Sequence, residues 1–279
     1  MATSDVDDNP LEAITNLFTG GDEADPNDPS AMSLVEHLEE LRRRIFKILL
    51  ALVLFSIVAF IFREQIMNFL TWPLPAQANA LGHGERKLTV TGLGEGFTTY
   101  LLLALAGGFV ASLPVTLYQI WAFVSPGLYA HEKKNAVPFI IVGLVLFLAG
   151  ISLGYVVLQY PVAWLVNFGA DTFTELISVN SYFTFVAFFL LAFGVVFEIP
   201  LVLTFLSMVG IISAETLTKK RAISHVVMWV AASFLTPGAD LYSPVILGVT
   251  MSCLFELSVF FIKLTTRMRA RREAAEVEA

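Results

Sequence analysis

Six long runs of apolar residues dominate the chain and are separated by short polar segments. They cover residues 45–62, 100–124, 137–158, 182–212, 223–235 and 241–262. About 20 apolar residues in a helix are needed to cross a hydrocarbon core of roughly 30 Å. The runs are continuous, whereas the strands of a membrane barrel alternate apolar and polar residues. The pattern therefore predicts an all-α integral membrane protein with six transmembrane helices.

Two of the runs have unusual lengths. Run 223–235 has 13 residues, which at about 1.5 Å per residue is too short for the core, so we expect a short fifth helix and a locally thinner bilayer. The sixth helix is a candidate for a second short one. Run 182–212 has 31 residues and is long enough to tilt or to project from the membrane. Pro200 inside it predicts a kink, because proline lacks the backbone N–H.

Composition supports the membrane class and narrows the function. The chain is 56% hydrophobic and 15% charged, with a mean hydropathy of +0.73, which excludes a compact water-facing globule. Its one cysteine, Cys253, can form no intrachain disulfide. Phosphate-loop, dinucleotide-binding and zinc-protease motifs are absent, so we expect no metal, no cofactor and no enzyme activity. A membrane-embedded protease also needs a nucleophile and a base at depth, and His225 lies near a membrane edge.

The positions of the basic residues predict the orientation. Fourteen of the 17 lysines and arginines lie before or at the start of the first run, after the last, or in alternate connecting segments. Basic residues accumulate on the cytoplasmic side. Both termini are therefore expected in the cytoplasm, with residues 63–99 forming short helices on the outer side.

The predicted domains follow from these boundaries. Residues 1–32 are acidic and contain proline and glycine, which favours a disordered cytoplasmic tail without the features of a cleavable signal peptide. Residues 33–262 form the six-helix transmembrane domain, and residues 263–279 a charged cytoplasmic tail. Most of the net charge of −7 comes from the acidic tail, so it gives no indication of a nucleic-acid partner.

Five local motifs, in order along residues 33–262, resemble those of the TatC family, the polytopic receptor subunit of the twin-arginine protein translocase. They are HLEELRRR at 37–44, YQIWAFVSPGLYAHEKK at 118–134, FGVVFEIP at 193–200, KKR at 219–221 and LTPGAD at 235–240. The resemblance implies a concave bundle that binds the signal peptides of folded cargo. It also implies single-span TatA/TatB-type partners, self-association, export driven by the proton-motive force, and a prokaryotic plasma membrane.

Two carboxylates in these motifs are the predicted acceptors for the arginine pair. Adjacent guanidinium groups are best bound by carboxylates in charge-assisted, bidentate pairs. The resemblance assigns this role to Glu40 and Glu132. Without it, Glu40 is better explained as a helical ion-pair partner of Arg44, four residues later, and Glu132 as an ordinary loop charge.

Neighbouring residues have a binding interpretation and a simpler one. Arg42 lies at a position important in the family, but it also serves as a topology signal. Phe123 and Tyr129 either line the peptide site or belong to the interfacial aromatic belt. Pro73 and Pro126 are expected to end helices or form turns.

Glu198 is the strongest candidate inside a predicted span. An ionisable residue at that depth is costly and usually faces a polar cavity or a partner. The alternative is a protonated acid hydrogen-bonded to a carbonyl freed by Pro200. Gln119 is either a polar contact in the second span or a packing residue, and Asp240 is a structural candidate expected to cap the last helix.

Two other functions remain open from the sequence. A small-solute secondary transporter is the main alternative, although the two halves of the chain do not resemble each other, as they do in many such proteins. A membrane-embedded enzyme is the other.

Overall fold

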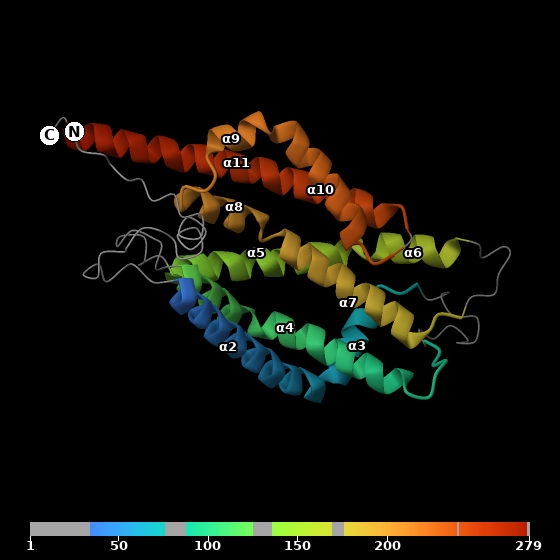
Figure 1. Cartoon of the computed structure of the whole chain (residues 1–279). Helices are drawn as coiled ribbons and strands as arrows, with labels where there is room; N and C mark the ends of the chain where they lie inside the picture. The colour runs from blue at the N-terminus through green and yellow to red at the C-terminus, as the bar shows by residue number, and fades with distance from the viewer. Residues whose placement is uncertain (1–33, 76–87, 125–135, 169–175, 239, 278–279) are drawn as a thin grey trace, which may run out of the picture. The chain divides into compact units, whose positions relative to one another are not determined.

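The computed structural model describes residues 34–75, 88–124, 136–168, 176–238 and 240–277 (Figure 1). Among the described residues, those up to Arg43 belong to one unit and those from Arg44 onward to a second, and the packing below concerns the second. The described residues form helices and one isolated β-bridge, between Thr89 and Ser178. The helices are α2 (Leu34–Ile61), α3 (Arg63–Thr71), α4 (Glu95–Val124), α5 (Ala136–Val157), α6 (Gln159–Asn167), α7 (Val179–Val196), α8 (Ile199–Met208), α9 (Ala214–Lys219), α10 (Arg221–Leu235) and α11 (Tyr242–Val277).

The predicted set of spanning helices is confirmed within the described residues. Five helical stretches are long and apolar enough to cross a membrane, and a shorter apolar helix, α10, accounts for the short fifth run. α10 has 15 residues, a length of about 22 Å. The sixth helix is not short, because α11 continues to Val277. Apolar residues end near 262, but no glycine or proline follows to stop the helix.

The predicted interruption at Pro200 is also confirmed. The fourth span consists of α7 and α8, and the break between them is at Phe197 and Glu198. Pro200 lies in the first turn of α8, where its missing N–H breaks no helical hydrogen bond. The third span is divided as well, because α6 follows α5 after Leu158 and extends beyond the predicted run.

Glycines allow the central helices to approach closely. α5 packs against α7, and α4 packs against both. A Cβ atom on Gly150 of α5 would lie 2.5 Å from the carbonyl oxygen of Phe193, and one on Gly194 would lie 2.7 Å from the ring of Phe147. Close backbone contact through small residues is a common way to join helices in membranes. A separate pair, α10 and α11, packs together, and α8 contacts α11 (Figure 1).

Hydrogen bonds hold together the end of the bundle near α3. The Tyr182 hydroxyl of α7 donates to the carbonyl of Leu70 at 2.8 Å, and the Tyr155 hydroxyl of α5 donates to that of Phe69 at 2.8 Å. The Glu95 carboxylate accepts from the backbone N–H of Asn180 at 2.9 Å, which joins the starts of α4 and α7. We call this the α3 end; the sequence predicts that it is the outer one.

Candidate functional site

The residues predicted to bind an arginine pair are only partly within the described chain. Glu40 and Arg42 both lie on α2, and their spacing of two residues turns them to different sides of the helix. Phe123 is half-buried in the last turn of α4. Glu132, Tyr129 and Pro126 fall in 125–135, outside the described residues. The pairing of Glu40 with Glu132 therefore stays a prediction.

Gln119 makes a polar contact between two helices near this region. It is 8% exposed, and its side-chain oxygen accepts a hydrogen bond from Arg44 Nη1 at 3.4 Å. This contact joins the last residue of the HLEELRRR motif to α4. Gln119 is thus both buried and hydrogen-bonded, so it combines the two roles that the sequence left open.

Glu198 lies at the break between α7 and α8. Both its carboxylate oxygens are buried, and neither has a hydrogen-bond partner among the described residues. The hydrogen bond to a freed carbonyl that the sequence left open is therefore not formed. Its neighbours are apolar: a Cβ on Gly143 would meet Glu198 Oε2 at 3.3 Å and the side chains of Leu117 and Leu201 at 2.9 and 3.0 Å. Buried polar atoms without partners are rare in folded proteins and often mark functional positions.

A polar cluster joins the short helix α10 to α11. Glu256 Oε1 lies 2.5 Å from Arg221 Nε and 2.9 Å from His225 Nε2. The other ring nitrogen of His225, Nδ1, lies 3.2 Å from Ser252 Oγ. The two pairs are spaced by four residues on consecutive helices, which places each pair on one helix face. The four-residue spacing within each pair is the signal in the sequence for this cluster, but the spacing does not show that the two helices meet.

We expect Glu256→Gln to loosen α10, because the change removes a carboxylate that accepts from two cation-capable side chains across the α10–α11 contact. Hydrogen exchange in α10 should accelerate, reflecting a loss of about 1 kcal/mol of local stability, since the pair is partly exposed. Glu215→Gln is the matched control, because Glu215 pairs with Lys219 on the exposed side of α9 and such pairs contribute only about 0.3–0.5 kcal/mol. Equal exchange in both variants would show that apolar packing alone holds α10.

The remaining predicted residues have local contacts. Asp240 is 7% exposed, and its carboxylate accepts from the N–H and the hydroxyl of Ser243, both at 2.6 Å, at the start of α11. Pro73 is buried just after α3. Pro200 is buried in the first turn of α8. No group of three or more metal-binding side chains lies together in the part of the chain that is described.

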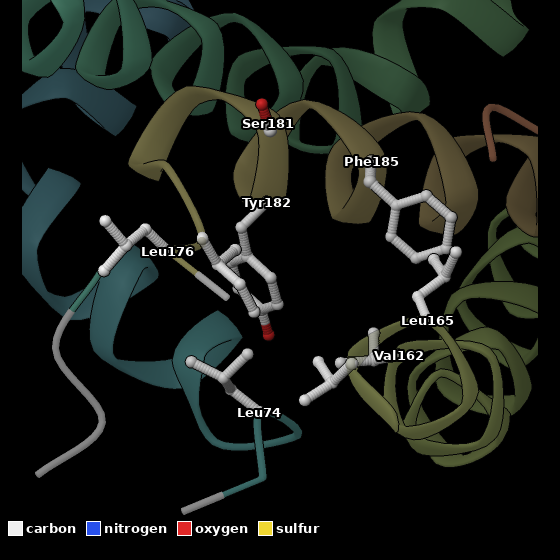
Figure 2. Close-up of a pocket in the computed structure, with 9 residues that line it drawn as sticks. Leu74, Val162, Leu165, Leu176, Ser181, Tyr182 and Phe185 are labelled. Atoms are coloured by element: carbon white, nitrogen blue, oxygen red, sulfur yellow. The ribbon is translucent and has the colours of Figure 1, made fainter. Parts of the chain in front are cut away.

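An apolar cavity of about 350 Å³ lies near the α3 end, between α6 and the start of α7 (Figure 2). Val162 and Leu165 line one side, and Leu74 and Leu176 lie across from them. The Tyr182 hydroxyl is already bonded to a backbone carbonyl. The described walls contain no carboxylate, so the cavity lacks the chemistry that an arginine pair needs.

Comparison with known proteins identifies close relatives over most of the chain. Residues 36–249 match the family described as Sec-independent protein translocase protein (TatC). The TatC protein of Desulforapulum autotrophicum is 36% identical over 244 residues, which cover 86% of this chain and 88% of that protein. The TatC protein of Escherichia coli K12 is 35% identical over 244 residues, which cover 86% of this chain and 92% of that protein.

A solved structure shares the fold. The crystal structure of the twin-arginine translocase receptor TatC superposes with a TM-score of 0.71 at 32% sequence identity. The match covers 83% of this chain and all of the solved one.

Proposed function

The chain belongs to the TatC family of Sec-independent protein translocase proteins, and on this premise we propose that it is the receptor that binds twin-arginine signal peptides of folded cargo. The observation that carries the proposal is the match to the solved twin-arginine translocase receptor, which covers the whole of that structure. The family consists of translocase components and not of enzymes. The enzyme alternative is thereby excluded, and no observation favours a small-solute transporter.

In the proposed site, Glu40 and Glu132 each receive one arginine of the signal peptide. Carboxylates bind guanidinium groups through charge-assisted hydrogen bonds, which are about twice as strong as neutral ones. Arg42 is proposed to orient the site or to hold α2 at the membrane surface. Phe123 and Tyr129 are proposed to pack against the apolar part of the peptide, since aromatic side chains contribute large contact areas.

The rest of the proposal concerns the membrane and the partners. We place the chain in a prokaryotic plasma membrane with both termini in the cytoplasm, which agrees with the distribution of lysine and arginine. Single-span subunits of the TatA/TatB type and further copies of this chain are the proposed partners for export driven by the proton-motive force. Glu198, with a buried carboxylate in a span, is the proposed polar contact for a partner helix, and Gln119 supports the site through Arg44.

Crosslinking to a signal peptide, here called a leader, tests the receptor function. The purified chain in lipid nanodiscs is mixed with a twin-arginine leader that carries a photo-crosslinker beside the arginines. Changing both arginines to lysine should reduce crosslinking at least about tenfold, because lysine cannot form the bidentate pair. Equal crosslinking of the arginine leader and the lysine leader would show that the chain does not recognise the arginines.

A further inference from the structure

Three helices converge on the carboxylate of Glu198 and leave a small space for it. Gly143 of α5 provides that space, because a Cβ there would lie 3.3 Å from Glu198 Oε2. This Cβ on Gly143 would also lie 2.9 Å from a side-chain carbon of Leu117 on α4 and 3.0 Å from one of Leu201 on α8. We call the space bounded by Leu117, Gly143 and Leu201 the Glu198 niche.

Aromatic side chains close the niche on the side away from the α3 end. Trp121, Phe139 and Phe205 are each four residues, or about one helical turn, from one of the three niche residues. Trp121 is buried, with its ring centroid 4.7 Å from that of Phe139 and 5.9 Å from that of Phe205. The rings of Phe139 and Phe205 are 5.9 Å apart. The three rings therefore form a layer directly beneath the niche.

The opposite side is closed in the same way. Phe147 and Leu113, one turn from Gly143 and Leu117, are both buried. Gly194, one turn before Glu198, fits so tightly that a Cβ on it would lie 2.7 Å from the Phe147 ring. Apolar groups thus enclose the carboxylate above, below and at its own level.

Glu198 nevertheless lies partly at the protein surface. The residue as a whole is partly exposed, whereas both carboxylate oxygens are buried. Long polar side chains usually place the apolar stem inside and the polar head outside, whereas here the polar head is buried. A carboxyl group without hydrogen bonds in apolar surroundings is costly, so a nearby donor at the surface would draw it outward.

We infer that the Glu198 carboxylate has two positions, one turned into the niche and one turned out to the lipid-facing surface, and that Gly143 is the positioning residue that permits the inward one. This inference rests on the proposed role of Glu198 as a contact for a partner helix. The inward position keeps the carboxylate from lipid while no partner is bound. The outward position offers it to a polar group on the partner.

Carbodiimide labelling of the full chain in nanodiscs, without any partner, tests the inference. Dicyclohexylcarbodiimide reacts with carboxyl groups that reach the lipid, and mass spectrometry measures the modification of Glu198. Gly143→Ala fills the niche and should speed the labelling several-fold. Gly107→Ala is the matched control, because a Cβ there meets Ala59 and Ile66 at 3.3 Å, away from the niche. Faster labelling of Glu256 in the same sample would show that the substitution loosens the whole fold and not only the niche.

An unchanged rate in folded Gly143→Ala would overturn the inference. If that variant does not fold, Phe205→Leu provides the test, because thinning the aromatic layer should speed labelling of Glu198 by a water-soluble carbodiimide; no change would again overturn it. A partner helix added afterwards should alter the labelling of wild-type Glu198. If the Gly143→Ala result holds but the partner has no effect, the niche stands and the proposed partner contact fails.

Discussion

Replacing both Glu40 and Glu132 with glutamine is expected to reduce the affinity for a twin-arginine leader by at least about 100-fold. Each carboxylate is proposed to accept charge-assisted hydrogen bonds from one guanidinium, and such bonds contribute about 1.5–3 kcal/mol each. Since 1.4 kcal/mol corresponds to a factor of ten, each single variant should lose roughly 10- to 100-fold. Titration of a fluorescent leader against the chain in nanodiscs measures the loss.

The control for this experiment lies next to the first carboxylate. Glu39 is exposed on α2, so Glu39→Gln removes the same charge one residue away and should leave leader affinity within a factor of about two, as surface substitutions usually do. Thermal unfolding of each variant shows that the fold is retained. Equal losses for Glu39→Gln and Glu40→Gln would show that net charge, and not a specific pair, attracts the leader.

Glu198→Leu is expected to keep leader binding but to lose export of folded cargo. Leucine fills the niche with an apolar group, so the partner helix has no acceptor for its polar side chain. Hydrogen bonds between helices in membranes contribute about 1–2 kcal/mol in model peptides, so association with the partner should weaken about tenfold. Export of a folded reporter in cells and co-purification of the single-span partner measure the two effects.

Glu198→Gln separates the hydrogen bond from the charge. The amide has nearly the same shape and can still accept and donate, so we expect intermediate export. Normal export by Glu198→Leu would mean that no partner requires this side chain. Loss of leader binding in the same variant would instead place Glu198 in the receptor site.

The sequence predicted the spans well because apolarity is a property of each segment alone. The short α10 and the break before Pro200 follow from run length and from the missing proline N–H. The end of α11 was missed, since the end of an apolar run does not end a helix that continues with good helix formers.

Contacts between helices were much harder to predict. Arg221, His225 and Glu256 meet only because α10 folds back along α11. Glu95 resembles an ordinary acidic residue at a helix start, yet its second oxygen accepts from Asn180, 85 residues later. The Glu198 niche depends on Gly143, which in the sequence is one more small residue in an apolar run. Such contacts need the relative rotation of helices, which residue spacing within one helix does not determine.

The hydrogen bonds at the α3 end impose an order on assembly during synthesis. They join residues separated by 85 to 112 positions, and a ribosome delivers the earlier partner first. α3 must therefore wait until α5 and α7 have been inserted before Tyr155 and Tyr182 can bind it. A nascent chain that stops before Tyr182 contains α3 and α4 but not the tyrosine of α7 that bonds to Leu70. This end of the protein is consequently completed late, after most of the spans are already in the bilayer.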